Sequence, residues 1–175
     1  MKAEKKAPAG TDKWIRPPPR TLKLNVDASF VMEEKLGATG AVLRDFMGTF
    51  VHAKCELLPH VQTAAMAEAM ALREGLKMVE EMGCHHIMVE SDSAETIQAL
   101  TGENRWWNES SAIFADCIDI ASNIGEVQFI FCPRDANQVA HEIAKYSFQH
   151  KIACNWDDEP PSFLLDKLLN DVTMI

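Results

Sequence analysis

The 175-residue sequence predicts an α/β domain built on a mixed five-stranded sheet. Residues 21–30 alternate strictly between apolar and polar side chains, which is typical of a β-strand. Residues 63–83 change to a helical period, with their apolar side chains on one stripe. Along the whole chain, three strand patterns come first and then helices alternate with strands, an order that favours one sheet with both antiparallel and parallel neighbours.

The strands are apolar or β-branched runs that turn residues separate. They are predicted at residues 21–30, 41–46, 49–58, 85–91 and 126–133. A tight turn at Met47 and Gly48 divides the second strand from the third, so the first three strands form an antiparallel meander.

The helices are predicted at residues 63–83, 93–100, 109–124 and 137–150. Residues 1–20 are rich in Lys, Ala and Pro and are expected to join rather than to pack, as a linker or tail. The domain then covers residues 21–150, and residues 151–175 form a C-terminal tail with a short amphipathic helix.

Composition narrows the function classes. A formal net charge of -9 argues against a protein that holds nucleic acid by bulk electrostatics, because such binding depends on Lys and Arg. The five cysteines lack CxxC spacing and indicate free thiols in a reducing compartment. Without a secretory or membrane-spanning pattern, we expect the nucleus or cytoplasm and no membrane partner.

Three acidic residues occupy positions that packing alone explains poorly. Asp27 lies in mid-strand, Glu68 lies on the helical stripe that faces the sheet, and Asp92 ends an apolar strand. Each has a simpler interpretation: a water-facing side of the strand for Asp27, a rim position for Glu68, and a helix N-cap of the capping-box kind, with Glu95, for Asp92.

If the three carboxylates converge, they raise one another's pKa values unless a cation lies among them. Carboxylate oxygens suit Mg²⁺ or Mn²⁺ better than zinc. Two such ions about 4 Å apart are a known device for phosphodiester cleavage, and carboxylates more than about 8 Å apart would exclude it.

Five motifs follow one another in an order that resembles the type 1 ribonuclease H domain, most closely its plant ribonuclease H-like (reverse-transcriptase-like) branch. They are "LKLNVDASF", "GATGAVLRDFMGTFV", "AEAMALREGLKMVEEMG", "VESDSAETIQAL" and "CPRDANQVAHEIAKYS". The resemblance covers residues 23–148 and implies a ribonuclease H-like fold with strand order 3-2-1-4-5 and helices on both faces. It also implies an endonuclease that hydrolyses the RNA strand of RNA/DNA hybrids with two Mg²⁺ ions, for which Mn²⁺ is a possible substitute.

By motif, the resemblance implies that Asp27, Glu68 and Asp92 are catalytic metal ligands, with Asp27 bridging the ions. Where well-formed members carry a fourth acid in the last helix, this chain has His141, on the same helical face as Asn137. His141 is then either a ligand or proton shuttle at the second ion, or a solvated helix histidine.

Other departures keep a second function open. The "PRDAN" segment is too short for the histidine-bearing loop of some bacterial members, and no basic hybrid-binding protrusion is present. Trp106 and Trp107 either stack on nucleic acid or pack a loop.

The alternative to an active endonuclease is a catalytically weak or inactive nucleic-acid-binding or interaction module of the same fold, derived from a retroelement. We expect a monomer, and the role of Glu90 stays open.

Overall fold

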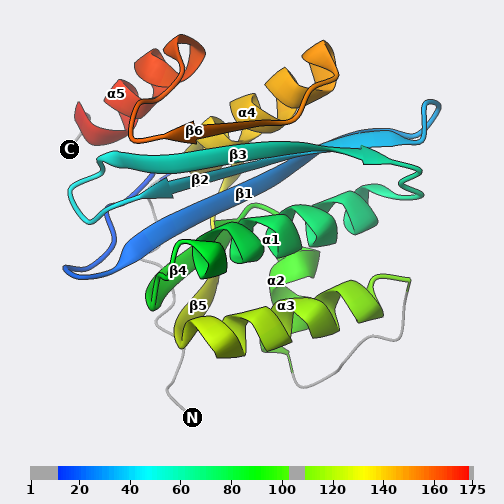
Figure 1. The fold of residues 1–175 in the computed structure, drawn as a ribbon, viewed down its shortest axis with the longest axis horizontal. Helices are drawn as coiled ribbons and strands as arrows, with labels where there is room; N and C mark the ends of the chain where they lie inside the picture. Colours follow the sequence, from blue (N-terminus) through cyan, green and yellow to red (C-terminus); the bar gives the residue numbers. More distant parts are fainter. Residues whose placement is uncertain (1–11, 103–108, 174–175) are drawn as a thin grey trace.

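A computed structural model of the chain describes residues 12–102 and 109–173. They form a mixed sheet of six strands in the order β5-β4-β1-β2-β3-β6 (Figure 1). The strands are β1 (Leu22–Val31), β2 (Leu36–Arg44), β3 (Phe50–Pro59), β4 (His86–Ser91), β5 (Glu126–Phe131) and β6 (Cys154–Asp157). The first five have the predicted order 3-2-1-4-5, and β6 adds a strand beside β3.

Helices cover both faces of the sheet, as predicted (Figure 1). On one face lie α1 (Ala64–Glu81), α2 (Ala94–Thr101) and α3 (Ser111–Ile124), and on the other lie α4 (Gln138–His150) and α5 (Leu165–Thr173). Short 3₁₀ turns, η1 (Arg134–Asn137) and η2 (Ser162–Leu164), precede α4 and α5. None of the helices in the described ranges is both long and apolar enough to cross a membrane.

The central strand β1 determines where the site forms. It pairs antiparallel with β2 and parallel with β4, which places Asp27 opposite Gly40 and Val26 beside Ser91. Because Asp92 directly follows Ser91, the register brings the two aspartates to neighbouring strands at the same level of the sheet.

Two glycines let helices approach the sheet closely. A Cβ on Gly75 of α1 would lie 2.6 Å from a methyl carbon of Val26, and a Cβ on Gly40 would lie 2.3 Å from the carbonyl oxygen of Ala140 in α4. Real Cβ atoms do not make such contacts, so a larger residue at either position would displace a helix. The two close approaches therefore position α1 and α4, which carry Glu68 and His141.

The polar face of β1 is buried, in contrast to the simpler interpretation of its alternating pattern. Lys23 is 2% exposed, Asn25 0% and Asp27 4%. The pattern predicted the alternation correctly, but α4 and the side chain of Trp14 cover the second face. Local periodicity shows only that two faces differ and says nothing of what covers each.

Three local expectations about the chain's outer parts need correction. The second strand was predicted at residues 41–46, whereas β2 spans Leu36–Arg44 and includes Gly37 and Gly40. The C-terminal tail contains the predicted helix, α5, and also the unpredicted strand β6, whose four residues are too few to show a period. Trp14 is 4% exposed, so part of the N-terminal segment packs. The boundaries of the domain, residues 21–150, stay a prediction.

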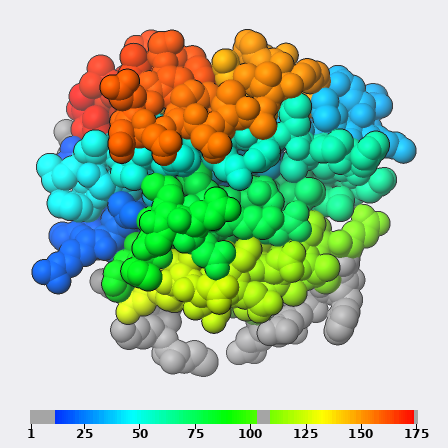
Figure 2. Space-filling model, in the orientation of Figure 1, coloured from blue at the N-terminus to red at the C-terminus, as the bar shows by residue number. Residues whose placement is uncertain are grey.

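The C-terminal part of the chain forms a continuous layer with α4. Figure 2 shows α4, β6 and α5, in orange to red, packed together along one side of the molecule. Its apolar contacts form a second core, separate from the one beneath α1. Members of the second core include Val42, Ala53, Ile143 and Leu164.

Candidate active site

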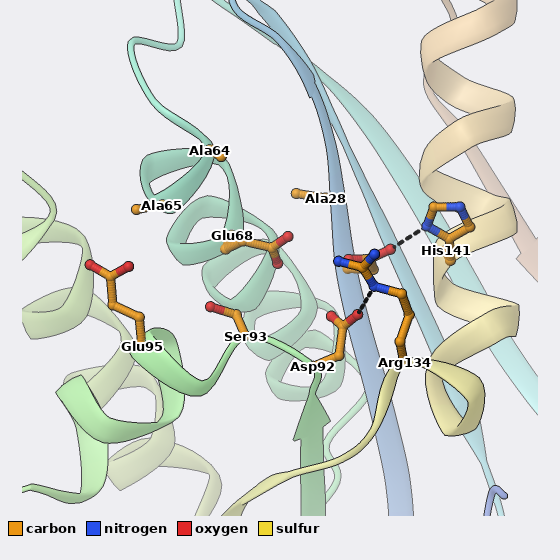
Figure 3. Close-up of a pocket in the computed structure, with 10 residues that line it drawn as sticks. Ala28, Ala64, Ala65, Glu68, Asp92, Ser93, Glu95, Arg134 and His141 are labelled. Atoms are coloured by element: carbon orange, nitrogen blue, oxygen red, sulfur yellow. Dashed lines mark hydrogen bonds and ion pairs between the residues drawn. The ribbon is translucent and has the colours of Figure 1, made fainter. Parts of the chain in front are cut away.

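Three carboxylates from three different elements meet in one pocket (Figure 3). Asp27 comes from β1, Glu68 from α1 and Asp92 from the end of β4. One oxygen of each carboxylate lies within 4.8 Å of the corresponding oxygens of the other two. The distance is well below the limit of about 8 Å beyond which the acids cannot share ions about 4 Å apart.

Asp92 is free to face the pocket because Ser93 is the N-cap of α2. The Ser93 hydroxyl accepts a hydrogen bond from the Thr96 backbone N–H at 3.2 Å. The capping-box interpretation of Asp92 is therefore wrong by one residue. Serine caps a helix as well as aspartate does, and sequence alone does not distinguish the two adjacent candidates.

Glu68 is the least satisfied carboxylate of the three. Burial, together with the charges of Asp27 and Asp92, raises its pKa from the ordinary 4.5 to about 9. Its Oε2 atom is buried and has no hydrogen-bond partner among the described residues. With one oxygen unpartnered and two other carboxylates nearby, the Glu68 carboxyl group is stable only with a proton or with a bound cation.

Asp27 has a raised pKa and a histidine partner. Burial and the charge of Asp92 raise its pKa to about 6, and the contact with His141 opposes part of that rise. The Nδ1 atom of His141 lies 2.9 Å from Oδ2 of Asp27. The His141 side chain is 46% exposed, so it reaches both the site and water.

Two residues from the segment after β5 also contact Asp92. The Nε atom of Arg134 lies 3.6 Å from Oδ2 of Asp92, and the Arg134 side chain is 84% exposed. Asn137 donates from Nδ2 to Oδ1 of Asp92 at 3.4 Å. Asn137 is the N-cap of α4 and is buried, whereas His141, one turn further along, is partly exposed.

Neither contact of Asp92 was predicted, although the sequence contains a signal for both. Polar residues between a strand and the following helix lie at the edge where parallel strands end, and such edges hold sites. The residues of "PRDAN" follow the parallel strand β5 in this way.

The donor set fits a hard divalent cation. It offers only carboxylate oxygens, as Mg²⁺ and Mn²⁺ prefer. It also concentrates negative charge that the surrounding protein neutralises only in part, as the raised pKa values of Glu68 and Asp27 show. A cation at this position would offset the repulsion between the carboxylates and give the unpartnered oxygen of Glu68 a partner.

Glu90 does not belong to the pocket. It forms a salt bridge with Lys23 and accepts a hydrogen bond from Asn25 at 3.1 Å, on the same face of β1 as Asp27 but further from the end of β4. Trp106 and Trp107 lie outside the described residues, so their two interpretations stay open.

The fold and the pocket of three carboxylates together define a ribonuclease H-like domain. A family model described as reverse transcriptase-like matches residues 25–147, and the chain belongs to this family. No match was found among curated proteins.

Solved structures of type 1 ribonucleases H share the fold. RNase H1 from the halophilic archaeon Halobacterium salinarum is 20% identical, with a TM-score of 0.69, over 74% of this chain and 98% of that one. LC11-RNase H1, isolated from compost, was solved with an RNA/DNA hybrid and is 18% identical, with a TM-score of 0.68, over 74% and 98%. At these identities the likeness shows the fold alone, and the plant branch stays a prediction.

Proposed function

We propose that the protein is a metal-dependent endonuclease that hydrolyses the RNA strand of RNA/DNA hybrids with two divalent ions, Mg²⁺ or Mn²⁺. The observation that carries the proposal is the convergence of Asp27, Glu68 and Asp92 within 4.8 Å. Membership of the reverse transcriptase-like family and the likeness to a structure solved with such a hybrid support the choice of substrate.

Asp27, Glu68 and Asp92 would hold the ions. When bound, the ions would supply a nucleophilic water at neutral pH and stabilise charge on the leaving oxygen. Water adds to the phosphorus and the bond to the 3′ oxygen breaks, so the products carry a 5′-phosphate and a 3′-hydroxyl. The attacking water gives up one proton in this step and the leaving 3′ oxygen takes one up, so the number of protons is unchanged.

The other residues of the pocket orient groups and exchange protons. His141 fixes one oxygen of Asp27 through Nδ1, which leaves its Nε2 atom to exchange a proton with water. The exposed guanidinium of Arg134 is positioned to bind a phosphate of the RNA strand. Selection of RNA would depend on its 2′-hydroxyls across a wide minor groove, which is recognition of shape.

The test is cleavage of a labelled RNA/DNA hybrid in Mg²⁺ and in Mn²⁺ by the native chain and by Asp27→Asn. We expect cleavage of the RNA strand by the native chain, none by the variant, and no cleavage of a DNA duplex of the same sequence. Identical traces for the native chain and the variant would refute the proposal.

A second candidate function is a non-cleaving module that binds nucleic acid. The favouring observation is His141, a neutral or positive group bound to Asp27 where the family pattern has a fourth acid. If the native chain leaves the hybrid intact but retards it in a gel, this function replaces the first. The nucleus or cytoplasm, and the monomeric state, stay predictions under either function.

A further inference from the structure

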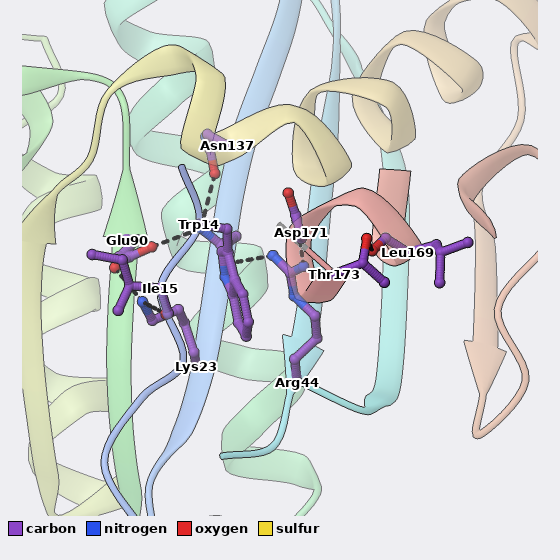
Figure 4. A network of polar contacts seen from close by, with 10 residues as sticks. Trp14, Ile15, Lys23, Arg44, Glu90, Asn137, Leu169, Asp171 and Thr173 are labelled. Atoms are coloured by element: carbon purple, nitrogen blue, oxygen red, sulfur yellow. Dashed lines mark hydrogen bonds and ion pairs between the residues drawn. The ribbon is translucent and has the colours of Figure 1, made fainter. Parts of the chain in front are cut away.

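A chain of side-chain hydrogen bonds links Trp14 and Asp171, near the two ends of the described sequence, to Asn137 (Figure 4). Asn137 in turn contacts Asp92. The centre of this chain is a pair of asparagines, Asn25 of β1 and Asn137 of η1, which we call the amide relay. Asn25 is 0% exposed and Asn137 is 1% exposed. The proposed reaction uses neither residue directly.

Asn25 uses every hydrogen-bonding position that its amide has. Its Oδ1 atom accepts from Nε1 of Trp14 at 2.9 Å and from Nη2 of Arg44 at 3.2 Å. Its Nδ2 atom donates to Glu90 and to Oδ1 of Asn137, both at 3.1 Å. Two donors and two lone pairs are the full capacity of an asparagine side chain.

Asn137 passes the relay on to the pocket. Its Nδ2 atom donates to the carbonyl oxygen of Val26 at 2.9 Å and to Oδ1 of Asp92 at 3.4 Å. It therefore joins the residue just before Asp27 to the carboxylate of Asp92. One amide thus holds two of the three acidic positions relative to each other.

The ends of the relay determine which way both amides point. The indole N–H of Trp14 and the guanidinium of Arg44 only donate hydrogen bonds, so the oxygen of Asn25 must face them. The nitrogen of Asn25 then requires the oxygen of Asn137, and the nitrogen of Asn137 is left for Asp92. An N–H donor, and not a carbonyl oxygen, therefore faces the carboxylate, which suits a deprotonated metal ligand.

Residues outside the family match hold these ends in place. Trp14 belongs to the N-terminal segment, and its ring lies 3.9 Å from the Arg44 guanidinium carbon. Asp171 of α5 accepts from Nη1 of Arg44 at 2.6 Å. The burial of Arg44 needs both contacts, since a buried charge without partners is strongly unfavourable.

We propose that Asn137 is a positioning residue for Asp92, and that Trp14 and Asp171 fix its orientation through Arg44 and Asn25. The inference rests on the proposed function, because it treats Asp92 as a metal ligand. Residues that orient a ligand from behind typically change metal affinity 10- to 100-fold when they are lost.

The test is the Mn²⁺ affinity of the full chain, measured by calorimetry without nucleic acid. Asn137→Ala is expected to weaken Mn²⁺ binding about 10-fold or more. Trp14→Phe keeps the ring over Arg44 and removes only the N–H donor, and it is expected to weaken binding in the same direction. Trp156→Phe is the matched control, because Trp156 packs in the second core, away from the relay.

The control separates positioning from general loss of stability. Trp156→Phe is expected to lower the melting temperature while leaving Mn²⁺ affinity unchanged. If Asn137→Ala binds Mn²⁺ as tightly as the native chain, the relay has no positioning role. If all three variants weaken binding in proportion to their loss of stability, the inference is equally overturned.

If the native chain binds no Mn²⁺, the proposed function is refuted. The relay can then still be tested separately, by the stability of the metal-free protein. Trp14→Phe and Asn137→Ala are combined in a double-mutant cycle of stability. Both residues hydrogen-bond to Asn25, so non-additive losses support the relay. Additive losses overturn it.

Discussion

The fold holds Glu68 and Asp27 close together although their charged forms would repel each other. Burial is the largest cause of the raised pKa of each, and a neighbouring carboxylate is the second. Side chains with these properties gather at functional sites, because packing alone would favour apolar residues there. At the scale of the residue, ionisation of these carboxyl groups is therefore unfavourable in the metal-free protein.

The raised pKa of Glu68 makes the stability of the metal-free protein depend on pH. A carboxyl whose pKa is higher in the folded state keeps a proton that the unfolded chain has lost. The metal-free protein therefore loses stability as the pH rises from about 4.5 to about 9. Glu68→Gln cannot ionise, and in EDTA at pH 8 it is expected to be more stable than the native chain by about 2 kcal/mol, less than the full pKa change since water reaches the pocket.

Thermal unfolding at pH 4 and pH 8 measures this difference. At pH 4 both proteins carry a neutral side chain at position 68, and the advantage of Glu68→Gln should vanish. Mn²⁺ should stabilise the native chain at pH 8 and leave the variant almost unaffected. A variant less stable than the native chain at pH 8 in EDTA would contradict this view of Glu68.

His141 gives a second prediction at this scale. His141→Asp adds a negative charge beside Asp27, and it is expected to tighten Mg²⁺ binding about 10-fold and to raise hybrid cleavage. His141→Ala is the matched control, because it removes the imidazole without adding charge. Equal Mg²⁺ affinity for both variants would show that position 141 does not reach the ions.

At the scale of the element, the position of α4 depends on Gly40, because a glycine has no Cβ to hold the helix away from the sheet. This glycine lies opposite Asp27 in the sheet and beneath Ala140, one residue before His141. The contact between Asp27 and His141 therefore depends on how closely the helix packs on β2. Burial of the second core, including Ile143 and Val42, holds it there.

Gly40→Ala should move α4 away from the sheet. The expected loss of unfolding free energy is about 1 to 3 kcal/mol, as for other overpacked cores, with a loss of Mn²⁺ affinity. Gly37→Ala on the same strand is the control, because its Cβ would approach no atom closer than 3.1 Å. Denaturant unfolding compares the two, and equal losses would argue against the close approach of α4.

The sequence predicted the elements better than it predicted their surroundings. The alternation of residues 21–30 and the helical stripe around Leu72 and Leu76 depend on neighbours a few positions away, and both predictions are confirmed. The burial of Lys23 depends on Glu90, which lies 67 residues further along the chain. Local patterns contain no information at that separation.

The candidate site was predictable to the extent that its residues break local rules. Asp27 and Glu68 were noticed because a strand and an apolar stripe disfavour them. The contact of Arg134 was not predicted, because polar residues are ordinary in a connecting segment, and Asn137 was predicted only to share a helical face with His141. Only the fold shows that this segment passes beside Asp92.

At the scale of the whole molecule, the net charge of -9 must be reconciled with an anionic substrate. Arg134 is the only Lys or Arg among the described residues that line the pocket. Binding that releases few counterions depends weakly on salt. The bound ions, and not a basic groove, would then bring the phosphate to the protein.

The salt dependence of hybrid binding tests this reading. For a non-cleavable RNA/DNA hybrid whose RNA strand keeps its 2′-hydroxyls, in constant Mg²⁺, log K against log salt should have a slope of about -1 to -2. Arg134→Gln should make the slope shallower by about one. Fluorescence anisotropy measures this slope at salt concentrations from about 50 to 200 mM. A slope steeper than about -5 would indicate a basic surface elsewhere.

The central claim is that Asp27, Glu68 and Asp92 form one divalent-metal site. Anomalous X-ray scattering from a crystal of the native chain soaked in Mn²⁺ tests it most directly. The account predicts a peak about 2 Å from carboxylate oxygens of these three residues, and its loss in a crystal of Asp27→Asn. Manganese bound elsewhere on the chain, with none between the three carboxylates, would contradict the account.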